Sequence, residues 1–378
     1  MIDLPLKTEN GINLFWQPDK LYDIAYELRE FSYNLDYVKT HRFTKEILFT
    51  HELKSNNAIE GYYEDLSSII KIINNPYVKS NMLDKEYKRI INLYNGYKYI
   101  LKRPHIDEDN LKELYTILSK KLLLPNEVLK ENQLYRDNDV YIFFSSDMSV
   151  EPDRGFDVKN IKNNMDILFN YINTNNKVSN EQLFFKSQII HFYMVYIHPY
   201  FDINGRTART TSLWFLNNKR AYSYTLFNRG ITYDKGTYYK IIRDVKKYKN
   251  LTPFVGFVAE KTKIELEKEF IIRNIENNIG YNLNPIDRQI LQYILSNNSN
   301  NTLLDLQSFY NRLNPKKKAI QINEEFLEPL ISQGIIIKKG ETSKFVCNDT
   351  KNYFYCLNSD IMDFDKSKIK RLNIDRFY

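Results

Sequence analysis

The sequence predicts a mainly α-helical protein with a small β-hairpin and a separate C-terminal domain. Apolar residues recur at spacings of three and four from about residue 22 to residue 110, as in Leu21–Leu28 and Tyr87–Tyr94, which is the period of an amphipathic helix. The 378 residues exceed the usual size of one domain, so we expect two or three packed units. Hydrophobic residues make up 43% and charged residues 27%, which indicates a folded, soluble chain rather than a disordered one.

Helices are expected to fill the first two regions, an N-terminal region over residues 1–110 and a core over residues 111–277. Short polar breaks such as Asn74-Asn75-Pro76 separate the helices of the first region. The helix expected at Glu181–Ile197 is apolar on most faces, so it should run through the centre of the core. The other helices of the core are expected at Leu111–Leu124, Val158–Asn173, Arg206–Asn217, Tyr238–Val245 and Pro253–Asn277.

A hairpin is predicted within the core at Gln133–Asp157. The run Val140–Phe144 is rich in β-branched and aromatic residues, and Asp, Asn and Ser on both sides supply turn chemistry.

The C-terminal part reads as a winged-helix-like domain over residues 283–348, followed by a tail over residues 349–378. Three short helices are expected, then two β-prone runs around Gly340; the expected elements are Pro285–Leu295, Leu303–Leu313, Glu324–Gln333, Ile335–Ile337 and Lys344–Val346. The basic run Lys316–Lys318 would suit DNA phosphates, which makes a DNA-binding regulator the alternative from another functional class. No candidate recognition helix is rich in arginine, so we favour a module for protein docking or homodimer formation over a nucleic-acid partner.

The bulk composition argues against several other classes. The two cysteines, Cys347 and Cys356, have no CxxC or Cys/His cluster nearby, which argues against a disulfide framework or a zinc site. Charges at Asp3, Lys7 and Glu9 interrupt the apolar stretch that a signal peptide would need, and no apolar run is long enough for a membrane span. The net charge of +7 is spread over the whole chain and favours a solvated surface. We therefore expect a cytoplasmic protein with no membrane partner.

The residues most typical of chemistry form one string, His198-Pro-Tyr-Phe-Asp-Ile-Asn-Gly-Arg-Thr-Ala-Arg209. A helix is expected to begin near Asn204, and its unpaired N–H groups and dipole would favour phosphate oxygens. Gly205 would allow a ligand close to the backbone. Arg206 and Arg209 are three positions apart, so both can reach a polyphosphate over that helix start.

Two further residues of the string have separate roles. Asp202 is a lone carboxylate beside the expected phosphate site, which is how proteins commonly hold magnesium. His198, as a neutral imidazole, can take the proton of an attacking hydroxyl.

This string resembles the signature of the Fic family, H-x-F-x-D/E-G-N-G-R-x-x-R, and a looser resemblance extends from about Lys45 to Lys263. It implies a Fic-type helical core and a protein adenylyltransferase, which moves AMP from ATP to a Ser, Thr or Tyr hydroxyl of a target protein or of itself. The family roles are a general base, a magnesium ligand, an anion hole and a triphosphate clamp; they fall here on His198, Asp202, Asn204 with Gly205, and Arg206 with Arg209.

Two positions depart from that signature. Tyr200 replaces a core Phe, and Ile203 replaces the first Gly of G-N-G. A β-branched residue tolerates positive φ poorly, so Ile203 is expected to affect the geometry of the anion hole. We keep a different nucleotide preference, and transfer of another phosphate-containing group, as alternatives.

The segment Asn56-Asn57-Ala58-Ile59-Glu60-Gly61 is similar to the inhibitory helix motif of the same family, with Asn56 in place of Ser or Thr. The resemblance implies that Glu60 pairs with Arg209 and keeps ATP from binding productively. A plain helix end with a glycine cap is the structural alternative. Removal of AMP is a further alternative, because Glu60 could position water.

Two sets of nucleotide contacts come only from the resemblance. The hairpin strand with Val140 and Ile142 corresponds to a flap that lines the nucleotide and docks the target by strand addition. Tyr238 and Tyr239 fall where family members place aromatic residues near adenine. The alternatives are a purely structural hairpin and a pair of core tyrosines.

Overall fold

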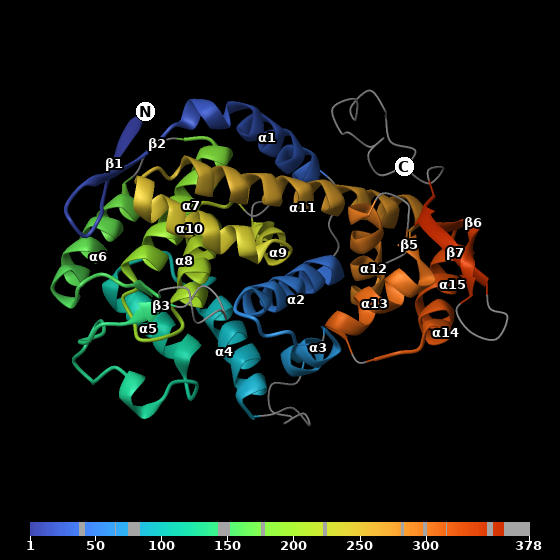
Figure 1. The fold of residues 1–378 in the computed structure, drawn as a ribbon, viewed down its shortest axis with the longest axis horizontal. Helices are drawn as coiled ribbons and strands as arrows, with labels where there is room; N and C mark the ends of the chain where they lie inside the picture. Colours follow the sequence, from blue (N-terminus) through green and yellow to red (C-terminus); the bar gives the residue numbers. More distant parts are fainter. Residues whose placement is uncertain are drawn as a thin grey trace. The chain divides into compact units, whose positions relative to one another are not determined.

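Helices dominate the computed structural model, so the predicted mainly α fold is confirmed (Figure 1). The structure describes residues 1–37, 42–64, 66–74, 84–142, 152–174, 178–221, 225–280, 283–297, 301–314, 316–345 and 351–358. In these residues, no helix is both long and apolar enough to cross a membrane. The chain divides into two compact units. Unit 1 comprises Met1–Ser32, Ser55–Tyr62 and Lys71–Glu265, and unit 2 comprises Tyr33–Lys54, Tyr63–Ile70 and Leu266–Tyr378.

Two helices form the centre of unit 1, α7 (Asn180–Ile197) and α8 (Asn204–Asn218), and they pack against each other. A capping box starts α7, because the backbone N–H of Ser179 donates to the side chain of Gln182 at 3.0 Å. Every residue from Ser187 to Ile197 is buried, which confirms that this helix runs through the core. The hydroxyls of Thr207 and Thr211 in α8 donate hydrogen bonds to backbone carbonyls one turn earlier. Both hydroxyls are therefore satisfied although the residues are buried.

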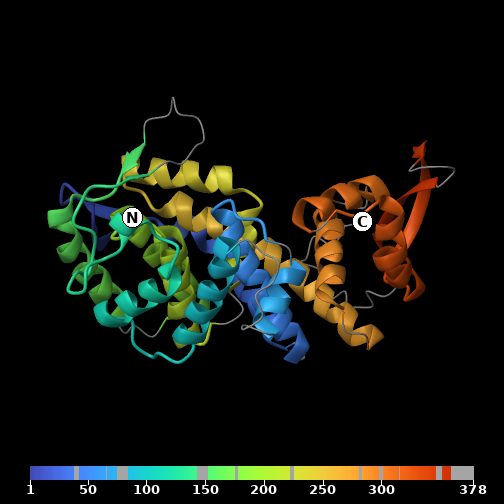
Figure 2. The same ribbon diagram turned by 90° about the horizontal axis from the view of Figure 1, so that it is seen from below.

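The remaining helices of unit 1 surround this pair (Figure 2). Helix α5 packs on α8 and α4, and α6 packs on α7. Asp107 and Asp157 cap α5 and α6 by accepting backbone N–H groups of the first turn. Besides α7 and α8, the described helices with at least part of their length in unit 1 are α1 (Tyr22–Tyr37), α2 (Arg42–Ile59), α3 (Leu66–Asn74), α4 (Asp84–Ile100), α5 (Glu108–Ser119), α6 (Val158–Asn173), α9 (Phe227–Thr232), α10 (Lys235–Tyr248) and α11 (Thr252–Ile279).

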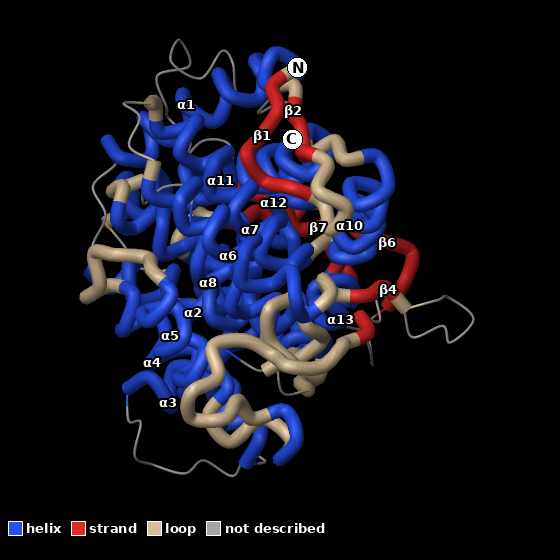
Figure 3. The backbone as a smooth tube through the Cα atoms, turned by 90° about the vertical axis from the view of Figure 1, so that its left-hand side faces the viewer, coloured by secondary structure: helices blue, strands red, loops and turns tan. Residues whose placement is uncertain are grey.

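Unit 1 also contains two small antiparallel sheets. The N-terminal hairpin β1 (Ile2–Lys7) and β2 (Asn13–Trp16) was not predicted; Figure 3 shows its strands side by side. The Tyr193 hydroxyl, on α7, donates to the Lys7 carbonyl at 2.8 Å, which anchors the hairpin on the core. The predicted hairpin contains the short strands β3 (Tyr141–Ile142) and β4 (Asp153–Arg154), while residues 143–151 lie outside the described residues.

The C-terminal part of unit 2 contains the three predicted helical segments in the predicted order. They are α12 (Pro285–Ser296), α13 (Leu303–Leu313), and a third segment built from α14 (Ala319–Ile322), a π-helical turn (Asn323–Leu327) and α15 (Glu328–Ser332). The strands β5 (Asn301–Thr302), β7 (Lys351–Leu357) and β6 (Ile336–Phe345) pair in that spatial order. The winged-helix assignment itself remains a prediction.

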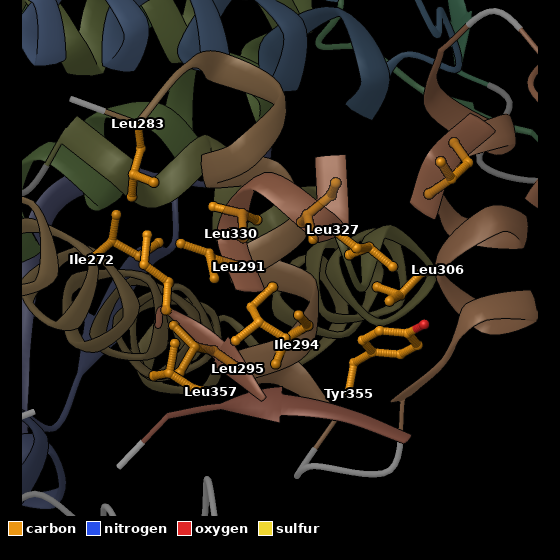
Figure 4. Close-up of a cluster of buried hydrophobic side chains, with 14 of the residues drawn as sticks. Ile272, Leu283, Leu291, Ile294, Leu295, Leu306, Leu327, Leu330, Tyr355 and Leu357 are labelled. Carbon is orange, nitrogen blue, oxygen red and sulfur yellow. The ribbon is translucent and has the colours of Figure 1, made fainter. Parts of the chain in front are cut away.

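The C-terminal sheet corrects the expected extent of this domain. Strand β7 lies in residues 349–378, which were predicted as a tail, and it pairs with both β5 and β6. Figure 4 shows Leu357 beside Leu295 and Ile294 of α12, within a buried apolar cluster. Tyr355, Cys356 and Leu357 at the end of β7 are all buried, and Tyr355 and Leu357 belong to this cluster, so β7 contributes to the core of the unit.

Candidate active site

The junction between α7 and α8 holds most of the predicted functional residues. His198 ends α7 with φ 55°, and Ile203 precedes α8 with φ 65°, so both adopt the left-handed conformation. The backbone N–H of His198 donates to the Met194 carbonyl at 3.0 Å, a common way to finish a helix. Helix α8 starts at Asn204, as the sequence predicted.

Ile203 has a positive φ, a conformation that a β-branched residue was expected to tolerate poorly. A left-handed conformation costs an L-residue of this type roughly 1–2 kcal/mol. The Ile203 side chain is buried, its N–H donates to Asp202 Oδ1 at 2.6 Å, and its carbonyl accepts both the N–H and the hydroxyl of Thr207. These contacts hold the residue in a conformation that glycine would adopt freely.

Asn204 fixes the loop rather than pointing its amide at a ligand. Its Oδ1 accepts the backbone N–H of Tyr200 at 3.0 Å, and its Nδ2 donates to the Tyr200 carbonyl at 2.8 Å. The Tyr200 ring stacks on Tyr115 with centroids 3.7 Å apart, which accommodates tyrosine at this position. The predicted anion-binding role of Asn204 is thus limited, in this structure, to its backbone.

The start of α8 accommodates a negative charge. No side chain of the described residues caps this helix N-terminus. A Cβ added to Gly205 would lie 2.3 Å from Glu60 Oε1 and 3.1 Å from an amino nitrogen of Arg209. Glycine is therefore required for the close approach, and the carboxylate of Glu60 lies where the helix dipole favours an anion.

Arg209 is held by two residues at the end of α2. Its guanidinium donates to Glu60 Oε1 at 2.6 Å, to Asn56 Oδ1 at 2.8 Å and to the Asn56 carbonyl at 3.2 Å. Asn56 also donates to the Tyr97 hydroxyl at 2.8 Å, which orients its amide. The expected pair of Glu60 with Arg209 is thus present, and Gly61 with φ 88° lies at the same helix end; the inhibitory role of Glu60 stays a prediction.

The pKa values of this ion pair agree with its geometry. Burial alone would raise the pKa of Glu60, but Arg209 and Arg206 outweigh burial and lower it. Burial likewise opposes the charge of Arg209, and Glu60 reverses that effect and raises the pKa of the guanidinium. Both groups are charged at neutral pH.

Arg206 is buried with an unsatisfied donor. Its Nε has no hydrogen-bond partner among the described residues, and its guanidinium lies 5.7 Å from the Tyr62 ring centroid. Burial lowers the pKa of Arg206, while the carboxylates of Glu60 and Asp202 oppose that fall. An unpaired donor in a buried cation is costly, so this side chain is suited to an incoming anion.

His198 is a neutral imidazole in this environment. Burial lowers its pKa to about 3; the Val195 carbonyl opposes this shift, and Lys246 and Arg136 add to it. Nδ1 lies 3.3 Å from the Val195 carbonyl oxygen and is assigned as the donor. The lone pair on Nε2 is then available to accept a proton.

Asp202 is exposed in the loop that precedes α8. Its carboxylate could serve as the one protein ligand of a magnesium ion. Among the described residues, no group of three or more His, Cys, Asp or Glu side chains is placed to hold a metal ion. Magnesium bound with phosphates needs only one or two carboxylates, because water and phosphate oxygens complete its shell. The residues present therefore fit the ion that the sequence implied.

Arg136 and Gly155 were not singled out from the sequence. The buried guanidinium of Arg136 donates to the carbonyls of His198 at 2.8 Å, Asn138 at 2.7 Å and Phe156. A Cβ on Gly155 would lie 2.7 Å from that guanidinium and 3.1 Å from the His198 Cβ. Together they fasten the base of the hairpin to the residue that ends α7. A lone arginine in a loop carries no local signal for this role.

The structure places the two predicted sets of nucleotide contacts, Val140 with Ile142 and Tyr238 with Tyr239, in different surroundings. The Val140 carbonyl accepts the Gly155 N–H at 3.2 Å, and Ile142 pairs with Asp153, so the hairpin base stands beside the motif. Tyr238 is 1% exposed, and its hydroxyl lies 2.9 Å from His191 Nε2, which is the burial expected of a core tyrosine; its contact with adenine stays a prediction.

Tyr239, by contrast, holds the end of α2. Its hydroxyl donates to the Ile59 carbonyl at 3.0 Å, immediately before Glu60. The side chain is half-buried and lies beside the ion pair of Glu60 with Arg209. It therefore contacts the segment that contains Glu60.

Comparisons with known proteins agree with this geometry. Residues 105–216, which include the whole string from His198 to Arg209, match the model of the Fic/DOC family. The fold is similar to a Fic family protein from Desulfovibrio desulfuricans G20, with a TM-score of 0.54 and 15% identity over 88% of this chain and 95% of that chain. It is also similar to a fragment of Fic-1 from C. elegans, with a TM-score of 0.52 and 15% identity over 66% and 72% of the two chains. At these identities the likeness concerns the fold.

Proposed function

We propose that this chain, which carries a Fic/DOC family domain at residues 105–216, transfers AMP from ATP to a hydroxyl side chain of a protein. Proteins with such domains typically transfer phosphate-containing groups to proteins. The observation that carries the proposal is a convergence at one helix junction. The His198 imidazole and the buried guanidinium groups of Arg206 and Arg209 all act electrostatically on Glu60, whose carboxylate lies against Gly205 at the start of α8.

The triphosphate of ATP would lie over the N-terminus of α8. Arg206 has a donor without a partner, and Arg209 would exchange the Glu60 carboxylate for a phosphate oxygen of similar charge. Magnesium at Asp202 would supply further charge neutralisation to the phosphates when bound. The backbone N–H groups at the helix start complete a site that favours anions.

The chemistry would be a direct transfer between oxygen atoms. Nε2 of His198 accepts the proton of a Ser, Thr or Tyr hydroxyl, and that oxygen forms a bond to the α-phosphorus. The bond from the α-phosphorus to the bridging oxygen breaks, and pyrophosphate leaves with the electron pair. Positioning and charge stabilisation supply most of the rate.

Glu60 would restrain this activity. Its carboxylate occupies Arg209 and lies against Gly205, so the γ-phosphate cannot reach the same guanidinium until Glu60 moves. Asn56 adds a second contact that keeps the arginine turned toward α2. Release of Glu60 alone should therefore raise activity, while Asn56 still orients the guanidinium.

The test uses ATP labelled separately at the α and γ positions, with the purified chain and a cell lysate as acceptors. We expect protein-bound label from the α position only, with more label for Glu60→Gly than for wild type and none for His198→Ala. Asp109→Gly, which removes an acidic residue from the first turn of α5, is the matched control and should behave as wild type. Label from the γ position, or full transfer by His198→Ala, would refute the proposal.

Removal of AMP is the second candidate, and the position of Glu60 favours it. An ionised carboxylate between two arginines at the phosphate site could orient water toward a modified side chain. Release of AMP from a protein modified by the Glu60→Gly variant, measured with wild type and with Glu60→Gln, separates the two directions.

A further inference from the structure

A cavity of about 840 Å³ lies within unit 1, at the N-terminal half of α7. Its walls come from the β1–β2 hairpin, the start of α1, the end of α6, and parts of α7 and α8. Lys186, whose side chain lines it, precedes His198 by twelve positions, or about 18 Å along a helix. The cavity is therefore separate from the candidate active site, and the inference drawn from it does not depend on the proposed function.

Aromatic rings form much of the cavity wall. Trp16 and Phe185 meet edge to face with centroids 6.0 Å apart, and Tyr26, Tyr171 and Phe215 line other parts of the wall. Such surfaces bind flat apolar groups by stacking and by release of water. The volume lies in the range of ordinary small-molecule sites.

Lys186 places a positive charge on this apolar wall. Its Nζ donates to the Thr174 carbonyl at 3.0 Å and lies 5.0 Å from the Tyr171 centroid and 5.5 Å from that of Phe215. Burial, together with the nearby ammonium of Lys219, lowers the pKa of Lys186 to about 8. In the described part of the chain, Lys186 forms no ion pair with a carboxylate.

The acidic residues of the cavity do not balance this charge. Glu181 lies 3.8 Å from Arg29, so its carboxylate already faces a cation. Asp19 lies on the exposed turn before α1. A partly buried ammonium that meets only a neutral carbonyl and ring faces retains capacity for an anion.

We infer that this cavity binds a small molecule with a flat apolar body and a single anionic group, with the anion at Lys186 and the body against the aromatic wall. A carboxylate or sulfonate on an aromatic framework is the matching chemistry. A neutral molecule of the same shape would lose the contact with the ammonium and keep only the apolar part of the binding energy.

Two fluorescent probes of closely related shape test this inference on the full chain. They are 8-anilino-1-naphthalenesulfonate, which is anionic, and N-phenyl-1-naphthylamine, which is neutral. We expect one molecule of the sulfonate per chain, and Lys186→Met should weaken its binding about tenfold or more, as expected for loss of a charge-assisted contact. The neutral probe should bind wild type and Lys186→Met alike.

Matched variants separate this effect from a general loss of charge or fold. Lys112 on α5 also donates its ammonium to a backbone carbonyl, that of Glu131 at 2.9 Å, but outside the cavity. Lys112→Met should bind both probes as wild type does, and Lys186→Arg should retain the sulfonate. Equal binding of the sulfonate by wild type and Lys186→Met, loss of it in Lys186→Arg, or no binding by wild type would each overturn the inference.

Discussion

At the scale of single residues, two left-handed positions shape the active-site loop. His198 and Ile203 both have positive φ, and neither is glycine. The sequence identified Ile203 as a departure from a glycine-containing signature and predicted its strain from β-branching. It did not predict how the strain is offset, because burial of the Ile203 side chain depends on tertiary packing, while the Thr207 contacts form only once the first turn of α8 is in place.

The strain at Ile203 makes a prediction with an unusual sign. Both Ile203→Gly and Ile203→Ala remove a buried side chain and should lower the free energy of unfolding by a few kcal/mol, on the order of 2–4. Glycine relieves the left-handed strain and alanine does not, so the glycine variant should be the more stable by about 1 kcal/mol. Urea denaturation of both variants measures the difference.

Ile190 in the middle of α7 is the matched control for that comparison. It is fully buried and helical, so alanine should be the more stable replacement there by about 1 kcal/mol. The same order of stability at both positions would contradict the assigned strain.

The protonation of His198 is a second residue-scale prediction. Because its pKa is lowered to about 3, the imidazole should stay neutral from pH 8 down to about pH 4.5, and protonation should begin only below that. Ring signals in an NMR titration of the free protein, assigned by loss in His198→Ala, should not move over this range. Free imidazole in the same sample reports that the pH range was covered, and a midpoint near 6.5 for His198 would contradict the burial argument.

At the scale of secondary-structure elements, the base of the hairpin and the end of α7 act as one piece. The Arg136 guanidinium donates hydrogen bonds to the carbonyls of His198, Asn138 and Phe156. Gly155 has no side chain and so leaves space for this guanidinium. Sequence analysis predicted the hairpin and the helix but not their connection, because one buried arginine that donates to distant carbonyls has no periodic signal.

Gly155→Ala should disturb this connection. The new methyl group would meet the Arg136 guanidinium and the His198 Cβ, so we expect a loss of roughly 1–3 kcal/mol in unfolding free energy. Under the proposed function, kcat for AMP transfer should fall more than KM for ATP rises, because the imidazole shifts while the arginines stay. Thermal unfolding and steady-state kinetics in the Glu60→Gly background measure both effects.

Gly236→Ala provides the matched comparison. A Cβ there meets nothing within 4 Å, and the residue lies near the start of α10, so alanine should be neutral or slightly stabilising. A Gly155→Ala protein that is as stable and active as Gly236→Ala would exclude a positioning role for the connection.

At the scale of the whole molecule, the sequence predicted more of the helical structure than of the sheets. Helix order and the central position of α7 followed from the apolar pattern, whereas β1, β2, β5 and β7 were missed. Strand β5 consists of only two polar residues and pairs with the distant β7, and such pairing leaves little local trace in so short a segment. Strand β7 does contain a β-prone aromatic run, Tyr353–Tyr355, which the expected tail assignment passed over. The active-site string was recognisable because its residues are contiguous; the deep burial of Tyr238 could not be predicted, because burial of a tyrosine depends on the surrounding core.

The charge pattern of the C-terminal part predicts that this chain does not bind DNA. Lys317, in the middle of the basic run, has its ammonium 2.7 Å from Glu325, which leaves Lys316 and Lys318 as the exposed members. We expect no retardation of random duplex in a gel-shift assay at 50 mM salt. A shift that weakens with salt and disappears in Lys316→Glu/Lys318→Glu would instead support the nucleic-acid alternative.

The contact between Glu60 and Arg209 has a thermodynamic consequence if the proposed function holds. A carboxylate of the chain and a phosphate of the nucleotide compete for one guanidinium, so their occupancies are linked and the linkage is reciprocal. The apparent affinity for ATP rises in proportion to the fraction of molecules in which Glu60 is displaced from Arg209. It reaches the intrinsic affinity of the open site when Glu60 is displaced in every molecule. A protein that captures the end of α2 would then act as an activator without touching the nucleotide, and saturating ATP would tighten the binding of that protein to the same degree.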